Sequence, residues 1–291
     1  MSKFRKGDIV GRISYNKDVI FEITKIIKTS SNNEICILKG ITERIVADSP
    51  PEDLEIMDKR IVSKKIKSIE DKIENRIQKC IKCGEYNIKR KNKMFYFIKN
   101  EKRGENQNIY TGKILHLDGD RKYSEKAAKY YKSLGLEAIV KNVPENKQVI
   151  MVKTLLDRYK PDILILTGHD GMIRKGTDFN NVYNYRNSRH FINTVNEARK
   201  WERTQEKNLA IFAGACQSYY EAIILAGANF ASSPKRIMID FIDPLIVAEK
   251  IAITDSNKYL RIEDIEEEIR EGRAGVDGVG SMGKRIIMNN E

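Results

Sequence analysis

Two stretches of the chain, DILILTGHDG (162–171) and LAIFAGACQS (209–218), share one layout. Each is a short, almost continuous apolar run that ends in small residues. One reactive side chain follows each run, His169 in the first and Cys216 in the second. Apolar runs of this length are typical of strands in a parallel sheet that is covered on both faces. The two runs therefore predict buried strands that each carry a reactive residue just beyond their end.

Similar strands alternate with amphipathic helices from residue 112 onward. We expect strands over 113–118, 136–143, 162–167, 209–215 and 228–233, and helices over 124–135, 146–160, 188–204, 218–227, 243–254 and 262–270. Ser124 is the expected N-cap of the first helix. This alternation predicts an α/β fold with a parallel sheet between two layers of helices. Binding sites in such sheets form beyond the carboxyl ends of the strands, where His169 and Cys216 lie.

The N-terminal part has a different pattern. Short β-branched runs separated by turn-forming residues predict a small β-barrel over 1–57, and FRKGDIV (4–10) resembles the opening of SH3-like barrels. Isoleucines at helical spacing predict a helix over 58–80, and the polar stretch 99–108 reads as an exposed loop. The predicted domains are therefore an SH3-like barrel (1–57), a basic helical linker (58–108) and an α/β domain (109–291).

Composition narrows the class of protein. No apolar stretch in the 291 residues approaches the roughly 20 that cross a membrane, and the N-terminus lacks an apolar secretory signal, so we expect an intracellular protein without a membrane partner. Four cysteines are too few for a disulfide framework. Cys80 and Cys83 form a single CxxC, whereas structural zinc sites commonly need two such pairs. We therefore expect no metal and no cofactor.

The chain has a net charge of +12, and residues 58–106 carry nine of these charges, with 16 Lys/Arg against 7 Asp/Glu. Such a segment is most simply a solvated helix with a basic linker. We therefore do not expect nucleic acid as a partner, although a basic segment can bind an anionic surface. A basic scaffold protein without catalysis, which would bind nucleic acid or another anionic partner, is the alternative interpretation of the chain.

The paired strand ends point to nucleophilic catalysis. A cysteine nucleophile needs a base and amide donors for the oxyanion. The spacing of 47 positions from His169 to Cys216 suffices for a loop, a helix and a return strand, so adjacent strands would bring the two side chains together. We also expect the helix after Cys216 to direct its N-terminus at the thiol and to favour the thiolate.

ILILTGHDG and LAIFAGACQS resemble the two motifs of the caspase-like cysteine peptidases. Each motif in that group is a hydrophobic strand, ending in His-Gly and in Ala-Cys respectively. The resemblance implies Cys216 as the nucleophile and His169 as its partner. Asp170 stands between His169 and Gly171, so either Asp170 or Gly171 would supply one oxyanion amide, with Cys216 as the second donor.

The resemblance narrows further. A small barrel, a basic linker, HLDGD (116–120), LTGHDG (166–171) and GACQSYYEAI (214–223) are together similar to a family of sporulation-specific cysteine proteases of endospore-forming bacteria. This implies an endopeptidase that cleaves after arginine. Its partners would be protein substrates, namely spore coat proteins and precursors of germination proteins. The implied location is the cytoplasm of the sporulating mother cell, in association with the spore coat.

A P1 arginine needs a carboxylate at the base of its pocket. Asp118 and Asp120 are the first candidates because they end the strand 113–118, and Asp240 and Asp243 are the second. Two other interpretations of LDGD (117–120) stay open: a turn with a helix-capping aspartate, and a pair of metal ligands in a phosphoryl-transfer or metal-dependent hydrolase.

The remaining histidines and the tail receive other predictions. We expect His116 and His190 to be structural. The glycine-rich tail, 272–285, follows no predicted strand and reads as a flexible flap. Its basic residues, Arg273 and Lys284–Arg285, would be candidate self-cleavage sites of an arginine-specific enzyme.

Overall fold

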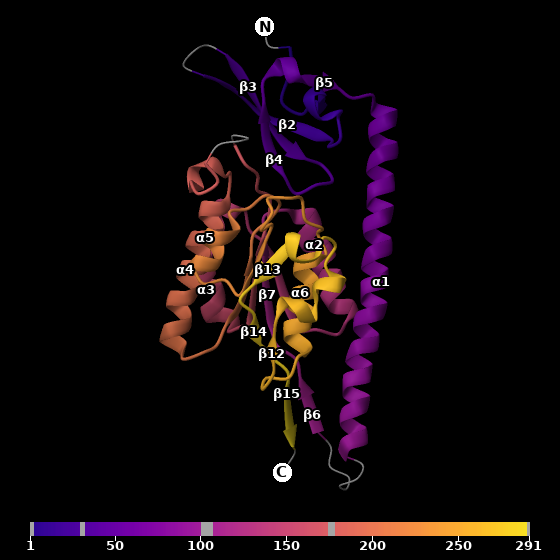
Figure 1. Cartoon of the computed structure of the whole chain (residues 1–291), viewed down its shortest axis with the longest axis vertical. Helices are drawn as coiled ribbons and strands as arrows, with labels where there is room; N and C mark the ends of the chain where they lie inside the picture. Colours follow the sequence, from indigo (N-terminus) through magenta and orange to yellow (C-terminus); the bar gives the residue numbers. More distant parts are fainter. Residues whose placement is uncertain (1–2, 30–32, 100–106, 174–177, 290–291) are drawn as a thin grey trace.

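The chain consists of an N-terminal sheet, a long helix and an α/β part. The computed structural model describes residues 3–29, 33–99, 107–173 and 178–289. In Figure 1 the N-terminal sheet lies above the α/β part, and the helix α1 runs down the side of the α/β part. The division into domains at residues 57 and 108 stays a prediction.

Five short antiparallel strands build the N-terminal sheet, in the order β4-β3-β2-β1-β5. Alternation along β2 and β3 places one set of side chains in an apolar core that includes Val10, Phe21, Ile23 and Leu38. The elements are β1 (Ile9–Arg12), η1 (Ile13–Tyr15), β2 (Phe21–Lys28), β3 (Glu34–Gly40), β4 (Val46–Ser49), η2 (Pro51–Asp53) and β5 (Leu54–Ile56).

Helix α1 (Lys59–Lys99) is 41 residues long and continues well past the predicted end at residue 80. The prediction was wrong because it took Gly84 and the polar residues after it as a stop signal. An isolated glycine costs only about 1 kcal/mol in a helix, and the lysines and arginines around it are good helix formers. Ile77 and Ile81 of α1 are buried against the α/β part. The predicted loop at 99–108 lies mostly outside the described residues, and Gln107 begins a strand.

The α/β part contains a six-stranded sheet in the order β13-β11-β10-β9-β7-β8. Its first five strands in the sequence are parallel, as predicted, and β13 joins the edge antiparallel. The strand order reverses between β7 and β9, which is where open α/β sheets form a crevice for ligands. The strands are β7 (Ile114–Asp118), β8 (Ala138–Asn142), β9 (Ile163–Thr167), β10 (Ala210–Ala213), β11 (Phe230–Ser232) and β13 (Val276–Gly278).

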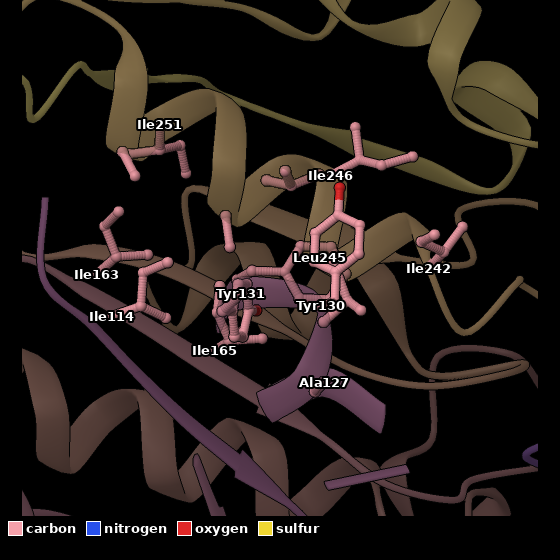
Figure 2. Close-up of a cluster of buried hydrophobic side chains, with 14 of the residues drawn as sticks. Ile114, Ala127, Tyr130, Tyr131, Ile163, Ile165, Ile242, Leu245, Ile246 and Ile251 are labelled. Atoms are coloured by element: carbon pink, nitrogen blue, oxygen red, sulfur yellow. The ribbon is translucent and has the colours of Figure 1, made fainter. Parts of the chain in front are cut away.

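Helices cover both faces of this sheet. On one face lie α2 (Arg121–Ser133) and α6 (Asp243–Ile253), whose apolar side chains meet strand residues such as Ile114, Ile163 and Ile165 (Figure 2). On the other face lie α3 (Glu145–Tyr159), α4 (Ser188–Gln205) and α5 (Tyr220–Leu225). A further 3-10 turn, η3 (Val182–Asn184), precedes α4. The predicted α/β class is therefore confirmed.

Two local predictions near the helix ends were wrong. Helix α2 begins before Ser124, and Asp120 is its N-cap because the Asp120 carboxylate accepts a hydrogen bond from the Lys122 amide. The helix predicted over 262–270 is replaced by two 3-10 turns, η4 (Ile262–Asp264) and η5 (Glu266–Glu268). So short a segment gains little from a full helix, whose nucleation is costly, and the turns still bury Ile262, Ile265 and Ile269.

The glycine-rich tail is not a flap. After the turn η6 (Gly272–Ala274), β13 pairs with β11 at the edge of the main sheet. Next, β14 (Ser281–Met282) pairs with β12 (Tyr259–Leu260), and β15 (Ile286–Asn289) pairs with β6 (Gln107–Tyr110). Backbone pairing with distant strands orders this segment, and local composition did not reveal those partners. None of the helices in the described ranges combines the length and apolar character of a transmembrane span.

His116 is buried in the middle of β7, as its predicted structural role requires. Its Nε2 lies 2.7 Å from Thr167 Oγ1 and its Nδ1 lies 3.2 Å from the Tyr131 hydroxyl. Burial lowers the His116 pKa to about 4; the charge of Asp118 acts in the opposite direction and that of Arg44 in the same one. In the unfolded chain this pKa returns to about 6.5.

We therefore expect His116 to make the fold acid-sensitive. Between pH 6.5 and 4 the unfolded state takes up a proton that folded His116 resists, so stability falls as the pH falls, by about 3 kcal/mol from this group. His116→Gln should remove that share of the difference in urea-unfolding free energy between pH 7 and pH 4.5. His190→Gln is the comparison: burial lowers the pKa of this half-exposed histidine too, so its replacement should remove a smaller share. An unchanged difference in His116→Gln would contradict this origin.

Candidate active site

His169 and Cys216 lie at the same edge of the sheet, at equal distances from their strands. Strands β9 and β10 are adjacent and parallel, with Leu166 directly opposite Ala213. His169 is three residues beyond Leu166, and Cys216 is three residues beyond Ala213. Because neighbouring strands are about 4.8 Å apart, the register sets both residues into adjacent loops, and the loop of His169 borders the switch point between β7 and β9.

Hydrogen bonds fix the backbone of His169 on both sides. Its amide donates to Glu145 Oε1 at 2.6 Å, and its carbonyl accepts from Asn187 Nδ2 at 2.7 Å. Gly168 leaves room for the Glu145 carboxylate, since a Cβ there would lie 2.2 Å from Glu145 Oε1. Sequence reasoning missed Glu145, which starts a helix 24 residues earlier and gives no local signal of this contact.

The Asp170 side chain ties the histidine loop to the start of α4. Its Oδ1 accepts from the amides of Gly171 (2.9 Å) and Asn187 (2.7 Å), and its Oδ2 accepts from Ser188 Oγ at 2.5 Å. Burial raises the Asp170 pKa to about 6, although these hydrogen bonds favour the charged form. Of the two predicted oxyanion amides, the Gly171 amide is thus bound to this carboxylate, and the Asp170 amide donates to the Arg44 carbonyl at 3.4 Å.

The same carboxylate also reaches the cysteine loop. Ser218 Oγ donates to Asp170 Oδ2 at 2.8 Å and accepts from the Ala215 amide at 2.9 Å. Asp170 and Ser218 thus connect the loop that carries His169 with the loop that carries Cys216. An acidic side chain directly after the histidine was visible in the sequence, but its role as a link between the loops was not.

Cys216 is fully buried beneath the N-terminal sheet. Its Sγ lies 3.8 Å from the Ile239 carbonyl oxygen, and its side chain belongs to the apolar core of that sheet. Burial raises the Cys216 pKa to about 11, against the lowering effect of the backbone of Ile239 and of the charge and backbone of Arg44. The helix predicted after Cys216 is present as α5, but it has only six residues and begins at Tyr220, four residues beyond the thiol.

The His169 ring is buried as well. Burial is the main cause that lowers its pKa, to about 3; the charges of Arg44 and Lys39 act in the same direction and those of Asp120 and Asp118 in the opposite one. The Tyr123 ring lies 6.4 Å away, centroid to centroid. The imidazole is therefore neutral at physiological pH, as a group that accepts a thiol proton must be.

Asp118 is fully buried at the end of β7, beside the strand that carries His169. Its Oδ2 accepts from Arg44 Nη2 at 2.6 Å and from Thr167 Oγ1 at 2.7 Å, and its Oδ1 accepts from the Asp120 amide at 2.7 Å. Asp120 is more peripheral, because its carboxylate caps α2 and pairs with Lys39 Nζ at 2.8 Å.

Asp240 and Asp243 lie elsewhere, at the start of α6. Both pair with Arg76 of α1, whose Nη2 is 2.9 Å from Asp243 Oδ1. Cys80 of the predicted CxxC packs against the apolar core between α1 and the α/β part, and the side chain of Cys83 is outside the described residues. No group of three or more metal-ligating side chains occurs within the described part of the chain.

A cavity of about 750 Å³ opens between the N-terminal sheet, α1 and the segment that contains Ile239. Arg44, Tyr123 and Asp240 are among the residues that line it. Asp118, His169 and Cys216 are not among its lining residues. The sequence did not predict the contact between the N-terminal sheet and the α/β part, because Arg44 and Asp118 are 74 residues apart.

Comparisons with known proteins identify the family of the chain. The profile of the family described as YabG peptidase U57 matches residues 5–288. The chain is 36% identical over 281 residues to the sporulation-specific protease YabG of Bacillus subtilis (strain 168), an alignment that covers 97% of this chain and 96% of that protein. No solved structure shows a significant match. The chain therefore belongs to the YabG peptidase family U57 and is a protease that acts on protein substrates.

Proposed function

We propose that this peptidase is a cysteine endopeptidase in which Cys216 and His169 form the catalytic dyad. The observation that carries the proposal is the shared register, which sets both residues three positions beyond paired residues of adjacent parallel strands. The link from Asp170 to Ser218 supports it, because a dyad needs its two loops held at a constant separation. The family assignment favours a peptidase over the non-catalytic scaffold.

The proposed reaction begins when neutral His169 accepts the Cys216 thiol proton while Sγ attacks the scissile carbonyl carbon. The amides of Asp170 and Cys216 hold the developing oxyanion. His169 then donates its proton to the leaving amine, and water hydrolyses the thioester that remains. Glu145 and Asn187 act as positioning residues, since they hold the backbone of His169.

The fold supports a caspase-like sandwich and a small SH3-like barrel as the finer description of the two parts. In the α/β part, the strands that precede His169 and Cys216 are neighbours, as the two motifs of that peptidase group require, and helices cover both faces. In the N-terminal part, five short antiparallel strands surround a single apolar core.

We further propose specificity for arginine at P1, with Asp118 as the carboxylate of the pocket. Asp118 lies at the end of β7, beside the strand of His169, and it already binds one guanidinium at 2.6 Å. Asp120, which caps a helix, and Asp240 and Asp243, which pair with α1, are weaker candidates.

The proposed substrates are spore coat proteins and precursors of germination proteins, processed in the mother cell and at the spore coat. The similarity to a protease named as sporulation-specific supports this assignment. Incubation of a spore-coat extract with the enzyme, followed by sequencing of the new N-termini, would identify the cleaved proteins. An extract that stays unchanged beside a cleaved arginine peptide would contradict the substrate assignment.

We expect Cys216→Ala to abolish peptide cleavage while leaving the fold intact. Wild type, Cys216→Ala and Cys80→Ala would be incubated with fluorogenic peptides that carry Arg, Lys, Asp or Leu at P1. Loss of the nucleophile should lower kcat/KM by at least a thousandfold, whereas Cys80→Ala should keep the wild-type rate. A Cys216→Ala variant with normal activity would refute the dyad.

We expect Asp118→Asn to reduce the preference for arginine over citrulline, which has the same shape without the charge. A charge-assisted hydrogen bond contributes about 1.5–3 kcal/mol, so the ratio of the two kcat/KM values should fall by roughly tenfold or more. Asp255→Asn makes the same chemical change in another Arg–Asp pair, with Arg285, and should keep the ratio. An equal decrease of kcat/KM for both peptides in Asp118→Asn would contradict a role of Asp118 in binding the P1 side chain and would indicate a structural role.

A further inference from the structure

The loop between β3 and β4 enters the crevice and pairs with the histidine loop. The Asp170 amide donates to the Arg44 carbonyl at 3.4 Å, and the Val46 amide donates to the Asp170 carbonyl at 2.9 Å. Ile45 and Asp170 thus form a parallel β-bridge. The approach is close, since a Cβ at Gly171 would lie 2.2 Å from the Val46 carbonyl oxygen. Extended substrates bind to proteases by backbone pairing of this kind.

The Arg44 side chain is buried against Asp118, the carboxylate proposed to bind a P1 arginine. Its Nη2 is 2.6 Å from Asp118 Oδ2, and the two side chains are only 2% and 0% exposed. The guanidinium also lies over the Tyr123 ring, 4.9 Å from the centroid, and the Tyr123 hydroxyl donates to the Thr42 carbonyl at 2.8 Å. Within the described residues, the buried Arg44 Nε has no hydrogen-bond partner.

Stability alone does not account for this arrangement. Removing an arginine and an aspartate from water costs several kcal/mol for each ion, and apolar replacements of such pairs are often neutral or stabilising. The Arg44 backbone also hydrogen-bonds to the Cys216 thiol and acts to lower its pKa. One residue therefore presents its carbonyl to a proposed oxyanion amide, its backbone to the proposed nucleophile and its side chain to the proposed P1 carboxylate.

We propose that residues 42–46 occupy the active site as a substrate does, with Arg44 in the P1 position, and that the Arg44–Ile45 peptide bond is a self-cleavage site. The inference rests on the proposed dyad and arginine specificity. It differs from the sites predicted in the tail, where Arg285 is buried in a pair with Asp255 and the exposed Arg273 pairs with Asp277.

The step balances with water as the only co-reactant. Cys216 Sγ attacks the carbonyl carbon of Arg44 and passes its proton to His169. The Arg44–Ile45 bond breaks as the Ile45 nitrogen takes this proton and leaves as a free amine. Water then cleaves the thioester, which leaves a carboxylate on Arg44 and restores the Cys216 thiol. The products are residues 1–44 and residues 45–291.

The N-terminal sheet would then be a cover over the nucleophile. Cys216 shares the apolar core of this sheet with Phe4, Ile45 and Ala47. As long as the cover is in place, Arg44 competes with any external arginine for Asp118. Cleavage between β3 and β4 removes the covalent link that holds Arg44 in that position.

The test follows the full-length chain by intact mass and N-terminal sequencing during incubation, and measures hydrolysis of an arginine-P1 peptide in the same samples. We expect wild type to yield a fragment that begins at Ile45, whether before or during incubation. Cys216→Ala should stay intact. Arg44→Gln should form this fragment at least tenfold more slowly, and Arg44→Lys at an intermediate rate. Arg5→Gln alters an exposed arginine of the same N-terminal part and should cleave normally.

Hydrolysis of the arginine-P1 peptide distinguishes a failure of the self-cleavage proposal from a failure of the proposed function. Wild type that hydrolyses the peptide but stays uncut at Arg44 would overturn the self-cleavage site and leave the proposed function standing. Wild type that cuts neither the peptide nor itself would overturn both. Circular dichroism of Arg44→Gln shows whether it has folded. Should that variant fail to fold, Arg44→Lys, which keeps the charge on Asp118, gives the decisive rate.

Discussion

The parallel register of β7, β9 and β10 is the constraint on which the rest of the site depends. Leu117 lies opposite Leu166, and Leu166 lies opposite Ala213, so three loops leave the sheet from one row. A shift of one residue in any of these pairings would turn the side chains to the other face of the sheet. The apolar layers on both faces resist such a shift, and thus the hydrophobic core sets the geometry of the chemistry.

Burial then determines the charge states of the side chains in the loops that follow these strands. It keeps the His169 imidazole neutral and the Cys216 thiol protonated, and it raises the Asp170 pKa. The N-terminal sheet is responsible for part of this burial, because its apolar core includes Cys216. The described conformation is accordingly one in which the nucleophile is closed off from solvent. Access to the thiol and its ionisation are therefore coupled, since uncovering the sulfur would also lower its pKa.

Much of the fold could be predicted from the sequence because each strand of the α/β part is marked locally by an apolar run, and each helix by its period. The stop assigned near Gly84 and the flap assigned to 272–285 failed, because tertiary packing and distant strand pairing outweighed local composition. His169 and Cys216 could be singled out because rare residues followed matching strands. Arg44 could not, since nothing near LKGITERIVA (38–47) indicates a partner 74 residues away.

The strand order of the N-terminal sheet has a consequence for reversibility. The loop that holds Arg44 separates β3 from β4, and β4 and β5 form the two edges of the sheet, with β3, β2 and β1 between them. A chain opened in this loop would keep β4 and β5 attached to α1, while the three central strands would become a separate molecule of 44 residues. Its return to the site would then be a bimolecular event that weakens on dilution, whereas the intact loop is always present at a high effective concentration. Cleavage of one peptide bond would thus make occupancy of the active site by Arg44 depend on the concentration of the released fragment, whereas in the intact chain it does not.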